Sequence, residues 1–371
     1  MKIGLISFHN AYNYGAALQA YALQKRIESM DIECEYINYV NKKRAQSYDM
    51  NYQFRDALKQ KKYKRAFRVL VGTPFINSRG KRFEKFYEKY VKKTKKIYHS
   101  SKEASELNDY YEKFIVGSDQ VWNNEHNGND CAFLLDFVKE PSKKISYASS
   151  FGMDVIPDDL IENYKSCIES IGKLSVREKS GVDMIKKLTG REASLVLDPV
   201  FLISVKEWKK IKSKRKKGKP YVFFYTNNNH QMRDFLKTGF SVKGLKSHVL
   251  STHISIKDFI KTKTKVSMSP EEFLQEIYNS EFVVTASFHC VAFSIIFHKQ
   301  FCAILTGQPG RDERIKNLLK ITGLENRILT DNTKLEDLQK KIDYTDVEEK
   351  LKTYREYSQK YLVSAILSKE N

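Results

Sequence analysis

Short apolar runs alternate with amphipathic stretches along the first half of the chain, which is the pattern of strands connected by helices. The runs that we predict as buried strands are residues 2–8, 33–39, 113–116, 144–148, 174–176 and 195–197. Between the first two runs, apolar residues from Ala16 to Ile27 recur at helical spacing, which predicts a helix. The four strands from residue 113 onward end in polar residues. This is typical of a parallel sheet with one functional edge.

The second half of the chain shows the same alternation most clearly between Ser269 and Leu305. Ser269 has the residue type of a helix N-cap, and Glu272 lies three positions later to complete a capping box. Residues 282–285 form a short apolar run that predicts a strand, and residues 291–297 are apolar again, which predicts a buried helix. A strand that feeds a helix through four residues is the core of a βαβ unit.

The patterns predict an α/β protein with two Rossmann-like domains and mostly parallel sheets, and a length of 371 residues fits two domains. We expect an N-terminal domain at residues 1–205, a basic linker at 206–219 and a C-terminal domain at 220–371. The linker is expected because the run holds nine basic residues and a single acid. A final helix at roughly residues 347–367 is expected to pack back on the first domain.

Residues 41–102 differ from the rest of the first domain because they are rich in Lys, Arg, Tyr and Phe. We expect two or three basic amphipathic helices there, inserted at the rim of the domain and broken at Thr73 and Pro74. The whole chain is also basic, since 65 Lys and Arg against 45 Asp and Glu leave a net charge of +20. This charge favours phosphorylated metabolites, membrane phosphates or nucleic acid as partners. For the insertion, a solvated face and an anionic membrane surface both remain open.

The cysteines and the N-terminus indicate where in the cell the protein is expected to be. The five cysteines are far apart and lack CxxC or metal-ligand spacing, so the sequence predicts neither a disulfide framework nor a metal site. The N-terminal apolar run is too short for a signal peptide or a membrane span. We therefore expect a cytoplasmic protein, with a peripheral position at the inner face of the membrane left open. The absence of GxGxxG and Walker A sequences disfavours NAD and P-loop nucleotide binding.

Polar residues directly after the predicted strands are the site candidates of the first domain, because ligands collect at the carboxyl ends of parallel strands. The candidates are Asn13, Gly15, Gly117, Ser118, Asp119 and Asp198. Asn13, Gly15, Gly117 and Ser118 are expected to line the ligand cleft. Any tight turn would also favour Asn13 and Gly15, so that alternative stays open for these two.

In the second domain, Ser287 to Cys290 form the predicted turn between a strand and a helix. A helix N-terminus offers unpaired N–H groups and the positive end of the helix dipole, which suit a phosphate or a carboxylate. His289 stands in this turn together with Ser287, and a titratable cation there is an arrangement for holding an anion. A histidine in a turn can also simply bond the neighbouring backbone.

Six segments spread over nearly the whole chain follow one another in the order of a known family. They are KIGLISFHNAYNYGAALQAYALQ, FIVGSDQVWN, KKISYASSFG, LSVREKSG with LVLDPVFL, SPEEFLQEIYNSEFVVTASFHCVAFSIIFHKQF and GRDERIKNLL. Together they resemble the bacterial polysaccharide pyruvyl transferase family. The resemblance implies a two-domain fold of the glycosyltransferase-B type and an enzyme that uses phosphoenolpyruvate as a co-substrate, without a cofactor, a nucleotide sugar or a required metal. The implied acceptor is a sugar of a cell-surface polysaccharide or a lipid-linked oligosaccharide precursor.

The resemblance also implies roles for particular residues. Arg177 in SVRE corresponds to an arginine that grips phosphoenolpyruvate, and His289 corresponds to the histidine of the second-domain turn. A basic anchor after the next strand falls at Arg311 or Arg314, which could equally form ion pairs with the acids between them. The chain departs from the family at Cys290, where relatives often have glycine, and a side chain there narrows the backbone freedom of the turn.

The implied reaction asks for cations and for an acid. Phosphoenolpyruvate carries a phosphate and a carboxylate, and arginine binds both groups through paired hydrogen bonds. Ketal formation needs an acid that protonates the methylene carbon. Asp119 and Asp198 are the candidates, and Asp119 ranks first because an Asp before Pro is commonly a turn residue. We expect Arg177 and His289 to face one cleft between the domains.

Two other functions remain open from the sequence. A nucleotide-sugar-dependent glycosyltransferase would share the fold, but it would need an acidic residue in the second domain to hold a ribose, and no clear candidate follows His289. A basic nucleic-acid-binding protein would explain the net charge. No nucleic-acid-binding module is recognisable in the sequence, so we expect no nucleic-acid partner.

Overall fold

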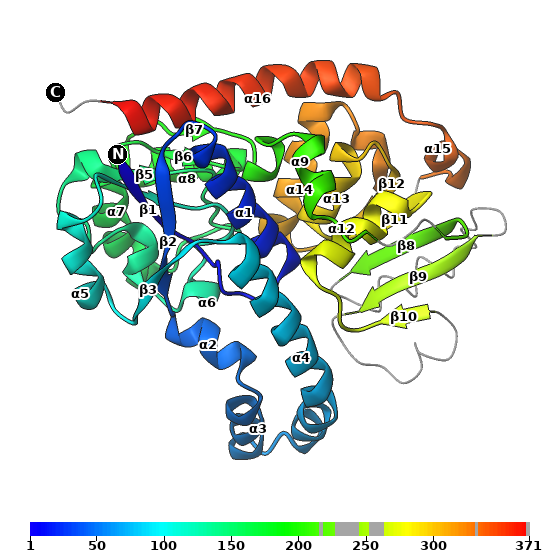
Figure 1. Ribbon diagram of the computed structural model, residues 1–371, viewed down its shortest axis with the longest axis horizontal. Helices are drawn as coiled ribbons and strands as arrows, with labels where there is room; N and C mark the ends of the chain where they lie inside the picture. The colour runs from blue at the N-terminus through cyan, green and yellow to red at the C-terminus, as the bar shows by residue number, and fades with distance from the viewer. Residues whose placement is uncertain (215–217, 227–244, 252–262, 331–332, 369–371) are drawn as a thin grey trace. The chain divides into compact units, whose positions relative to one another are not determined.

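The computed structural model describes residues 1–214, 218–226, 245–251, 263–330 and 333–368 (Figure 1). The chain folds into two compact units. Unit 1 comprises Met1–Pro74, Phe83–Ile203 and Tyr354–Asn371, and unit 2 comprises Phe75–Arg82 and Ser204–Thr353. The backbone therefore passes from one unit to the other four times along the sequence.

The core of unit 1 is a five-stranded sheet in the order β3-β2-β1-β4-β5, in which every pairing is parallel. Its strands are β1 (Lys2–Ile6), β2 (Glu33–Tyr39), β3 (Lys93–Tyr98), β4 (Lys113–Val116) and β5 (Lys144–Ser146). The register pairs Ile6 with Val116 and Val116 with Ser146. The carboxyl ends of β1, β4 and β5 therefore finish level, at the edge where such sheets bind ligands.

A short pair of parallel strands lies beside β5 in unit 1. It consists of β6 (Ser175–Val176) and β7 (Ser194–Leu195). Single bridges join Ile145 to Lys173 and Ser149 to Val176, so β6 runs alongside β5 and the residues that follow it. All six strands predicted for the first half are present, although several are shorter than predicted.

Helices pack against the sheet of unit 1. One of them is α1 (Tyr14–Glu28), whose alanines let it approach β2 closely enough for Tyr36 Oη to donate to the Ala20 carbonyl at 3.1 Å. The others with their bounds are α5 (Ser101–Ala104), α6 (Asn124–Asn127), α7 (Ile161–Glu169) and α8 (Lys179–Thr189).

The predicted helical insertion consists of α2 (Lys42–Tyr48), α3 (Met50–Lys59) and α4 (Tyr63–Tyr90). Two expectations about it are wrong. Pro74 lies inside α4 and does not break the helix, and Thr73 Oγ1 bonds the Val69 carbonyl at 2.8 Å in the turn that precedes the proline. Residues 93–98 form the edge strand β3 instead of a helix, because their backbone pairs with β2, and lysines suit a sheet edge.

Unit 2 is built on a six-stranded parallel sheet in the order β10-β9-β8-β11-β12-β13. The strands are β8 (Tyr221–Thr226), β9 (Lys246–Ser251), β10 (Lys263–Lys265), β11 (Phe282–Thr285), β12 (Gln300–Ile304) and β13 (Ile328–Leu329). Its helices include α12 (Pro270–Asn279), α13 (Phe288–Ile296), α14 (Pro309–Thr322) and α15 (Leu335–Gln339). The predicted capping box of α12 is confirmed, with Ser269 and Glu272 bonded reciprocally at 3.3 and 2.9 Å.

The expected linker at residues 206–219 is partly wrong. Helix α9 (Val205–Ile211) occupies its first half, and Trp208 is fully buried there with its ring 4.8 Å from that of Phe293. Burial of this indole outweighs the solvation of the surrounding lysines, so the run begins as a packed helix. Residues 215–217 of the expected linker lie outside the described residues.

The last helix, α16 (Tyr344–Leu367), begins in unit 2, and its residues from Tyr354 onward belong to unit 1. In unit 1, Ser358 Oγ accepts from the Leu197 N–H at 2.9 Å, and Tyr361 Oη donates to the Ser146 carbonyl at 3.0 Å. The end of α16 is thereby fixed to the β5 and β7 side of the sheet. Among the helices of the described residues, none has both the length and the apolar character needed to cross a membrane.

Candidate functional site

The carboxyl edge of the sheet in unit 1 brings together four of the predicted site residues. Ser118 and Asp119 follow β4, Arg177 follows β6, and Asp198 lies shortly after β7. A backbone bridge between Asp119 and Ser149 continues the pairing of β4 with β5 beyond the strands themselves. The polar turns that were predicted to follow successive strands therefore meet at one place.

Arg177 is the centre of this cluster. Its Nη1 lies 2.6 Å from Asp198 Oδ2, and its Nη2 lies 3.4 Å from Asp119 Oδ1. The arginine side chain is only 2% exposed. Burial lowers the pKa of Arg177, but the neighbouring carboxylates of Asp198 and Asp119 outweigh it, so the pKa is raised overall and the guanidinium stays charged.

The two aspartates beside Arg177 differ in their surroundings. The Asp198 side chain is fully buried, caps a short helical turn by accepting from the Val200 N–H at 3.1 Å, and lies 3.2 Å from Ser118 Oγ. Asp119 is 14% exposed and makes the longer of the two contacts to the arginine. Asp198 is therefore held on several sides, whereas Asp119 is the carboxyl that reaches the surface.

The backbone of this edge is held in unusual conformations. Gly117 has a φ of 120°, and a Cβ at this position would lie 2.2 Å from the Tyr147 carbonyl oxygen, so only glycine fits. Two residues with side chains, Asp119 and Ala148, also have positive φ angles, of 79° and 49°. Such conformations cost free energy and concentrate at functional sites, which supports a role for this edge.

Buried polar side chains that the sequence analysis missed support the backbone at Ser118. Its N–H donates to Gln19 Oε1 at 3.0 Å, Gln19 Nε2 donates to Ser7 Oγ at 3.0 Å, and Ser7 Oγ donates to the Ser118 carbonyl at 2.9 Å. Glu178, which is 1% exposed, accepts from the Phe151 N–H at 3.1 Å. The one signal of this buried network in the sequence was the polar residue Gln19 among the apolar positions of α1.

His9 lies beneath the same edge and was also missed. Its Nδ1 donates to the Ser7 carbonyl at 2.9 Å, and its ring stacks on Tyr36 with centroids 5.1 Å apart. Complete burial lowers the pKa of His9 to about 3, although the hydrogen bond to Ser7 opposes the shift. His9 is therefore neutral at physiological pH and acts as part of the support.

Asn13 and Gly15 take local roles in the structure. Asn13 is the N-cap of α1, and its Oδ1 accepts from the Ala16 N–H at 3.1 Å. Gly15 is buried in the first turn of that helix. Asn13 and Gly15 therefore serve the start of the helix, in line with the alternative that such residues simply suit a tight turn. Their expected place along a ligand cleft stays a prediction.

In unit 2, the predicted turn at Ser287 to Cys290 is a helix start. Ser287 is the N-cap of α13, and His289 lies in its first turn with 6% exposure. Thr285 Oγ1 accepts from the Ser287 N–H at 3.0 Å and donates to the Tyr225 carbonyl at 2.6 Å, which fixes the end of β11. Cys290 is helical and buried, so its Cβ needs none of the freedom of a glycine. Burial raises the pKa of its thiol to about 12.

The two arginines after β12 have different environments. Residues 310–314, expected as a turn, belong to α14, and Arg311 is exposed while Arg314 is 9% exposed. The Arg314 guanidinium lies 5.9 Å from the ring of Phe288, whose ring is 5.1 Å from that of His289. Asp312 accepts from the Thr306 and Gly307 N–H groups at 2.8 Å each. The carboxylate between the arginines therefore closes a turn, and Arg314 is the one that lies beside Phe288 at the start of α13.

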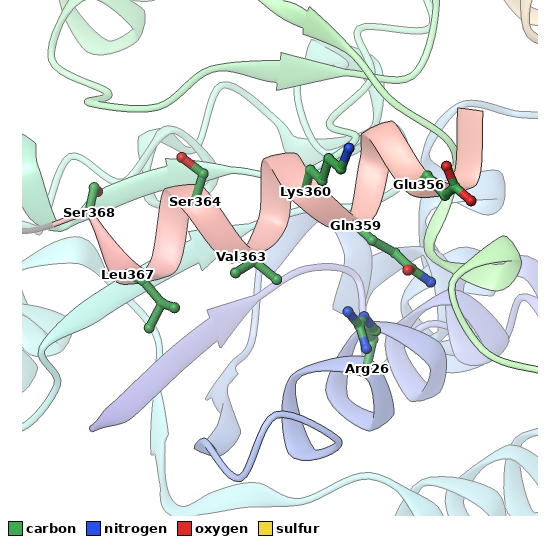
Figure 2. Close-up of a pocket in the computed structure, with 8 residues that line it drawn as sticks. All are labelled: Arg26, Glu356, Gln359, Lys360, Val363, Ser364, Leu367 and Ser368. Atoms are coloured by element: carbon green, nitrogen blue, oxygen red, sulfur yellow. The ribbon is translucent and has the colours of Figure 1, made fainter. Parts of the chain in front are cut away.

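A separate groove lies within unit 1 between α1 and the last helix (Figure 2). Its lining residues are Arg26, Glu356, Gln359, Lys360, Val363, Ser364, Leu367 and Ser368. In Figure 2, Gln359 points from α16 toward Arg26. Helix α1 starts at the carboxyl edge of the sheet and runs back from it, so Arg26 near its end lies toward the opposite edge. The groove is therefore distinct from the cluster around Arg177.

Comparison with solved structures bears on the fold. The UDP-GlcNAc 2-epimerase from Neisseria meningitidis has a TM-score of 0.50 and 9% identity, with 99% of this chain and 100% of that chain covered. The UDP-GlcNAc 2-epimerase from Methanocaldococcus jannaschii has a TM-score of 0.50 and 11% identity, with 99% of both chains covered. At such low identity the likeness shows the fold alone. No curated protein matches the sequence.

Two parallel Rossmann-like sheets, with polar side chains at their carboxyl edges, define an α/β protein of the glycosyltransferase-B-like class, as the sequence predicted. A family model described as polysaccharide pyruvyl transferase matches residues 13–307, which is well over half of the chain. The chain therefore belongs to the polysaccharide pyruvyl transferase family, and the expected class of enzyme is a transferase.

Proposed function

We propose that this protein moves a pyruvyl group from phosphoenolpyruvate to two hydroxyls of a sugar, in a cell-surface polysaccharide or its lipid-linked precursor. The observation that carries the proposal is the family match, because it spans Asp119, Arg177, Asp198 and His289. A saccharide acceptor follows from the family, and phosphoenolpyruvate is the proposed donor. The proposal includes no metal and no further cofactor, and it places the reaction in the cytoplasm.

The proposed reaction begins with transfer of a proton to the methylene carbon of phosphoenolpyruvate, which leaves an oxocarbenium-like central carbon. One sugar hydroxyl attacks this carbon, the bond from the carbon to the phosphate oxygen breaks, and a second hydroxyl closes the ketal. The sugar loses two hydroxyl protons. One restores the acid that protonated the methylene carbon, and the other leaves with the phosphate.

Asp119 is the proposed acid. Asp119 and Asp198 contact one guanidinium, and the buried Glu178 contributes to the same field, so three carboxyl groups accompany a single cation. Of the three, Asp119 has a 14% exposed side chain, while Glu178 and Asp198 are 1% exposed as residues. A bound molecule could therefore reach Asp119 without opening the cluster.

Arg177 is proposed to grip the donor with one half of its guanidinium. Its Nη1 is held by Asp198 at 2.6 Å, whereas its Nη2 lies 3.4 Å from Asp119 Oδ1. An incoming carboxylate or phosphate could replace the longer contact while the shorter one keeps the arginine in place. Protonation of Asp119 would weaken that longer contact, so donor binding and acid formation support each other.

The unit 2 edge is proposed to hold the phosphate. His289 lies in the first turn of α13 close to Ser287, where the helix dipole favours negative charge. Arg314 lies near the same turn through its contact with Phe288. The expectation that His289 and Arg177 face one cleft stays a prediction.

Calorimetric titration of the purified protein with phosphoenolpyruvate tests the proposal. We expect saturable binding that Arg177→Gln weakens about tenfold or more, the effect of losing a charge-assisted pair. The matched control is Arg191→Gln, which alters an arginine of the same unit that bonds the Ile168 carbonyl at 3.0 Å and lies away from the cluster. No binding of phosphoenolpyruvate by the wild-type protein would contradict the proposal.

A nucleotide-sugar-dependent glycosyltransferase is the second candidate function. It is favoured by the whole-chain likeness to an epimerase solved with UDP-GlcNAc bound. The same titration with UDP-GlcNAc distinguishes the two. Binding of the nucleotide sugar in place of phosphoenolpyruvate would favour this candidate over pyruvyl transfer.

A further inference from the structure

The arm, defined here as residues 50–74, extends from unit 1 and consists of α3 and the first part of α4 (Figure 1). The two helices are held together by Arg65, which lies 2.9 Å from Asp56 and donates to Gln53 at 2.5 Å. Ala57 and Ala66 are buried in the arm. The arm is therefore a folded helical hairpin with an inner and an outer face.

The outer face of α4 in the arm is apolar and exposed. Tyr63, Phe67 and Leu70 are 67%, 68% and 60% exposed, and Val71 and Pro74 are exposed as well. Their spacing of four, three, one and three residues puts them on one side of the helix. A soluble surface seldom shows such a contiguous apolar stripe unless it binds something.

Cations surround this stripe. The arm contains Arg55, Lys59, Lys61, Lys62, Lys64, Arg65 and Arg68. Its single acid is Asp56, which is paired with Arg65, and no further acid occurs before Glu84. The outer face therefore combines large apolar side chains with a strong positive charge.

We propose that the arm binds the surface of an anionic phospholipid bilayer, with Phe67, Leu70 and Val71 entering the headgroup boundary and the lysines and arginines meeting lipid phosphates. A second copy of the chain is a poorer occupant, because it would bring two basic arms together. Nucleic acid would pair with the cations but would leave the aliphatic side chains exposed. The inference does not depend on the proposed pyruvyl transfer.

Sedimentation of the full-length protein with vesicles tests the arm. We expect binding to vesicles of phosphatidylcholine with phosphatidylglycerol, weaker binding to phosphatidylcholine alone, and release as salt rises. The double variant Phe67→Ser, Leu70→Ser should weaken vesicle binding at least about tenfold, because burial of each apolar side chain in the bilayer contributes to the free energy of binding. Lys64→Gln with Arg68→Gln should weaken it about tenfold and flatten the salt dependence.

The matched control is Val155→Ser, because Val155 is an apolar residue of unit 1 that is 74% exposed and lies outside the arm. It should bind vesicles as the wild type does. Thermal unfolding of each variant should match the wild type, since the changed side chains are exposed. Phosphoenolpyruvate binding, measured separately, should be unchanged in the arm variants.

A fluorescence measurement reports insertion directly. Both native tryptophans, Trp122 and Trp208, are fully buried, so a tryptophan introduced by Phe67→Trp would be the one sensitive to lipid. We expect its emission to shift to the blue with anionic vesicles and to be quenched by brominated lipid. Unchanged emission would overturn the proposal. Binding to RNA without binding to vesicles, or a dimer that Phe67→Ser with Leu70→Ser dissociates without vesicle binding, would overturn it too.

Discussion

The carboxyl edges of the two sheets carry opposite balances of charge. In unit 1, Arg177 is enclosed by Asp119 and Asp198, with Glu178 contributing to the same field. In unit 2, His289 and Arg314 lie near one helix start, and the nearby Asp312 bonds backbone N–H groups. One edge therefore gathers carboxyls around a cation, and the other gathers basic side chains at a helix N-terminus.

Under the proposed function, one architecture serves two chemical tasks. Both edges arise because parallel strands end level and polar residues follow them. A surplus of carboxyls suits proton transfer, whereas a histidine and an arginine beside a helix dipole suit the binding of an anion. The two edges differ in what their carboxylates contact. Asp119 and Asp198 contact a cation, whereas Asp312 accepts from backbone N–H groups.

The largest effect is expected from removal of the central arginine. Arg177→Ala should lower the free energy of unfolding by about 3–5 kcal/mol, because Asp198 would stay buried without its cation. Chemical denaturation measures this change. The matched control is Lys179→Ala, which breaks an exposed ion pair of the same unit with side chains 59% and 64% exposed. Equal losses of stability in the two variants would show that the buried ion pairs of Arg177 stabilise the fold no more than an exposed ion pair does.

Asp119→Asn should separate chemistry from stability. If Asp119 is the acid, turnover should fall by about two to four orders of magnitude while the fold and the binding of phosphoenolpyruvate remain. Phosphate release from phosphoenolpyruvate with a suitable acceptor measures turnover. Asp198→Asn is the comparison, and it should chiefly lower stability because its carboxyl is fully buried against Arg177. Full activity of Asp119→Asn would move the acid elsewhere.

His9 makes the unit 1 edge sensitive to acid. Its pKa is about 3 in the folded protein against 6.5 ordinarily, so below pH 6.5 the unfolded chain binds a proton that the folded protein does not. Stability should therefore fall as the pH drops from 6.5 toward 3, by about 2 kcal/mol at pH 5. His9→Asn keeps a donor for the Ser7 carbonyl but cannot titrate in this range. Denaturation curves at several pH values should be flatter for this variant, and an unchanged slope would contradict the assignment.

The smallest effect is expected at the unit 2 edge. Arg314→Gln should weaken phosphoenolpyruvate binding about tenfold, because one cation beside the start of α13 is lost. Arg311→Gln, a change of the same type at an exposed position of the same helix, should leave binding nearly unchanged. Titration calorimetry compares the two variants. An equal loss of phosphoenolpyruvate affinity in both variants would contradict the assignment of Arg314, rather than Arg311, as the arginine that binds the anion.

Local pattern was enough to predict much of the fold and part of the candidate site. Gly117 to Asp119 and Asp198 were found because they follow apolar strands and parallel strands end at a common edge, whereas Arg177 was singled out by the family resemblance. The supporting residues were missed because their partners are distant in sequence. Gln19 and Ser118, for example, are 99 residues apart.

The errors in the predicted elements have the same physical origin. Trp208 turns the start of a basic run into the packed helix α9, and pairing with β2 turns a lysine-rich stretch into β3. Pro74 stays inside α4, where tertiary packing outweighs a local preference. In each case a contact with a remote segment decides the outcome, and composition alone does not contain that contact.

The path of the backbone between the units constrains how members of this family can be recombined. Unit 1 includes the end of α16, and unit 2 includes Phe75–Arg82 from the middle of α4. Within unit 2, Arg82 pairs with Glu272 at 2.7 Å. A chimera that takes its second half from a relative after residue 203 would therefore carry a foreign last helix against the β5 and β7 side of unit 1, and would lack the matching piece of α4. A chimera that exchanges the whole of unit 2 should therefore take Ser204–Thr353 and Phe75–Arg82 together and retain the native residues from Tyr354 onward.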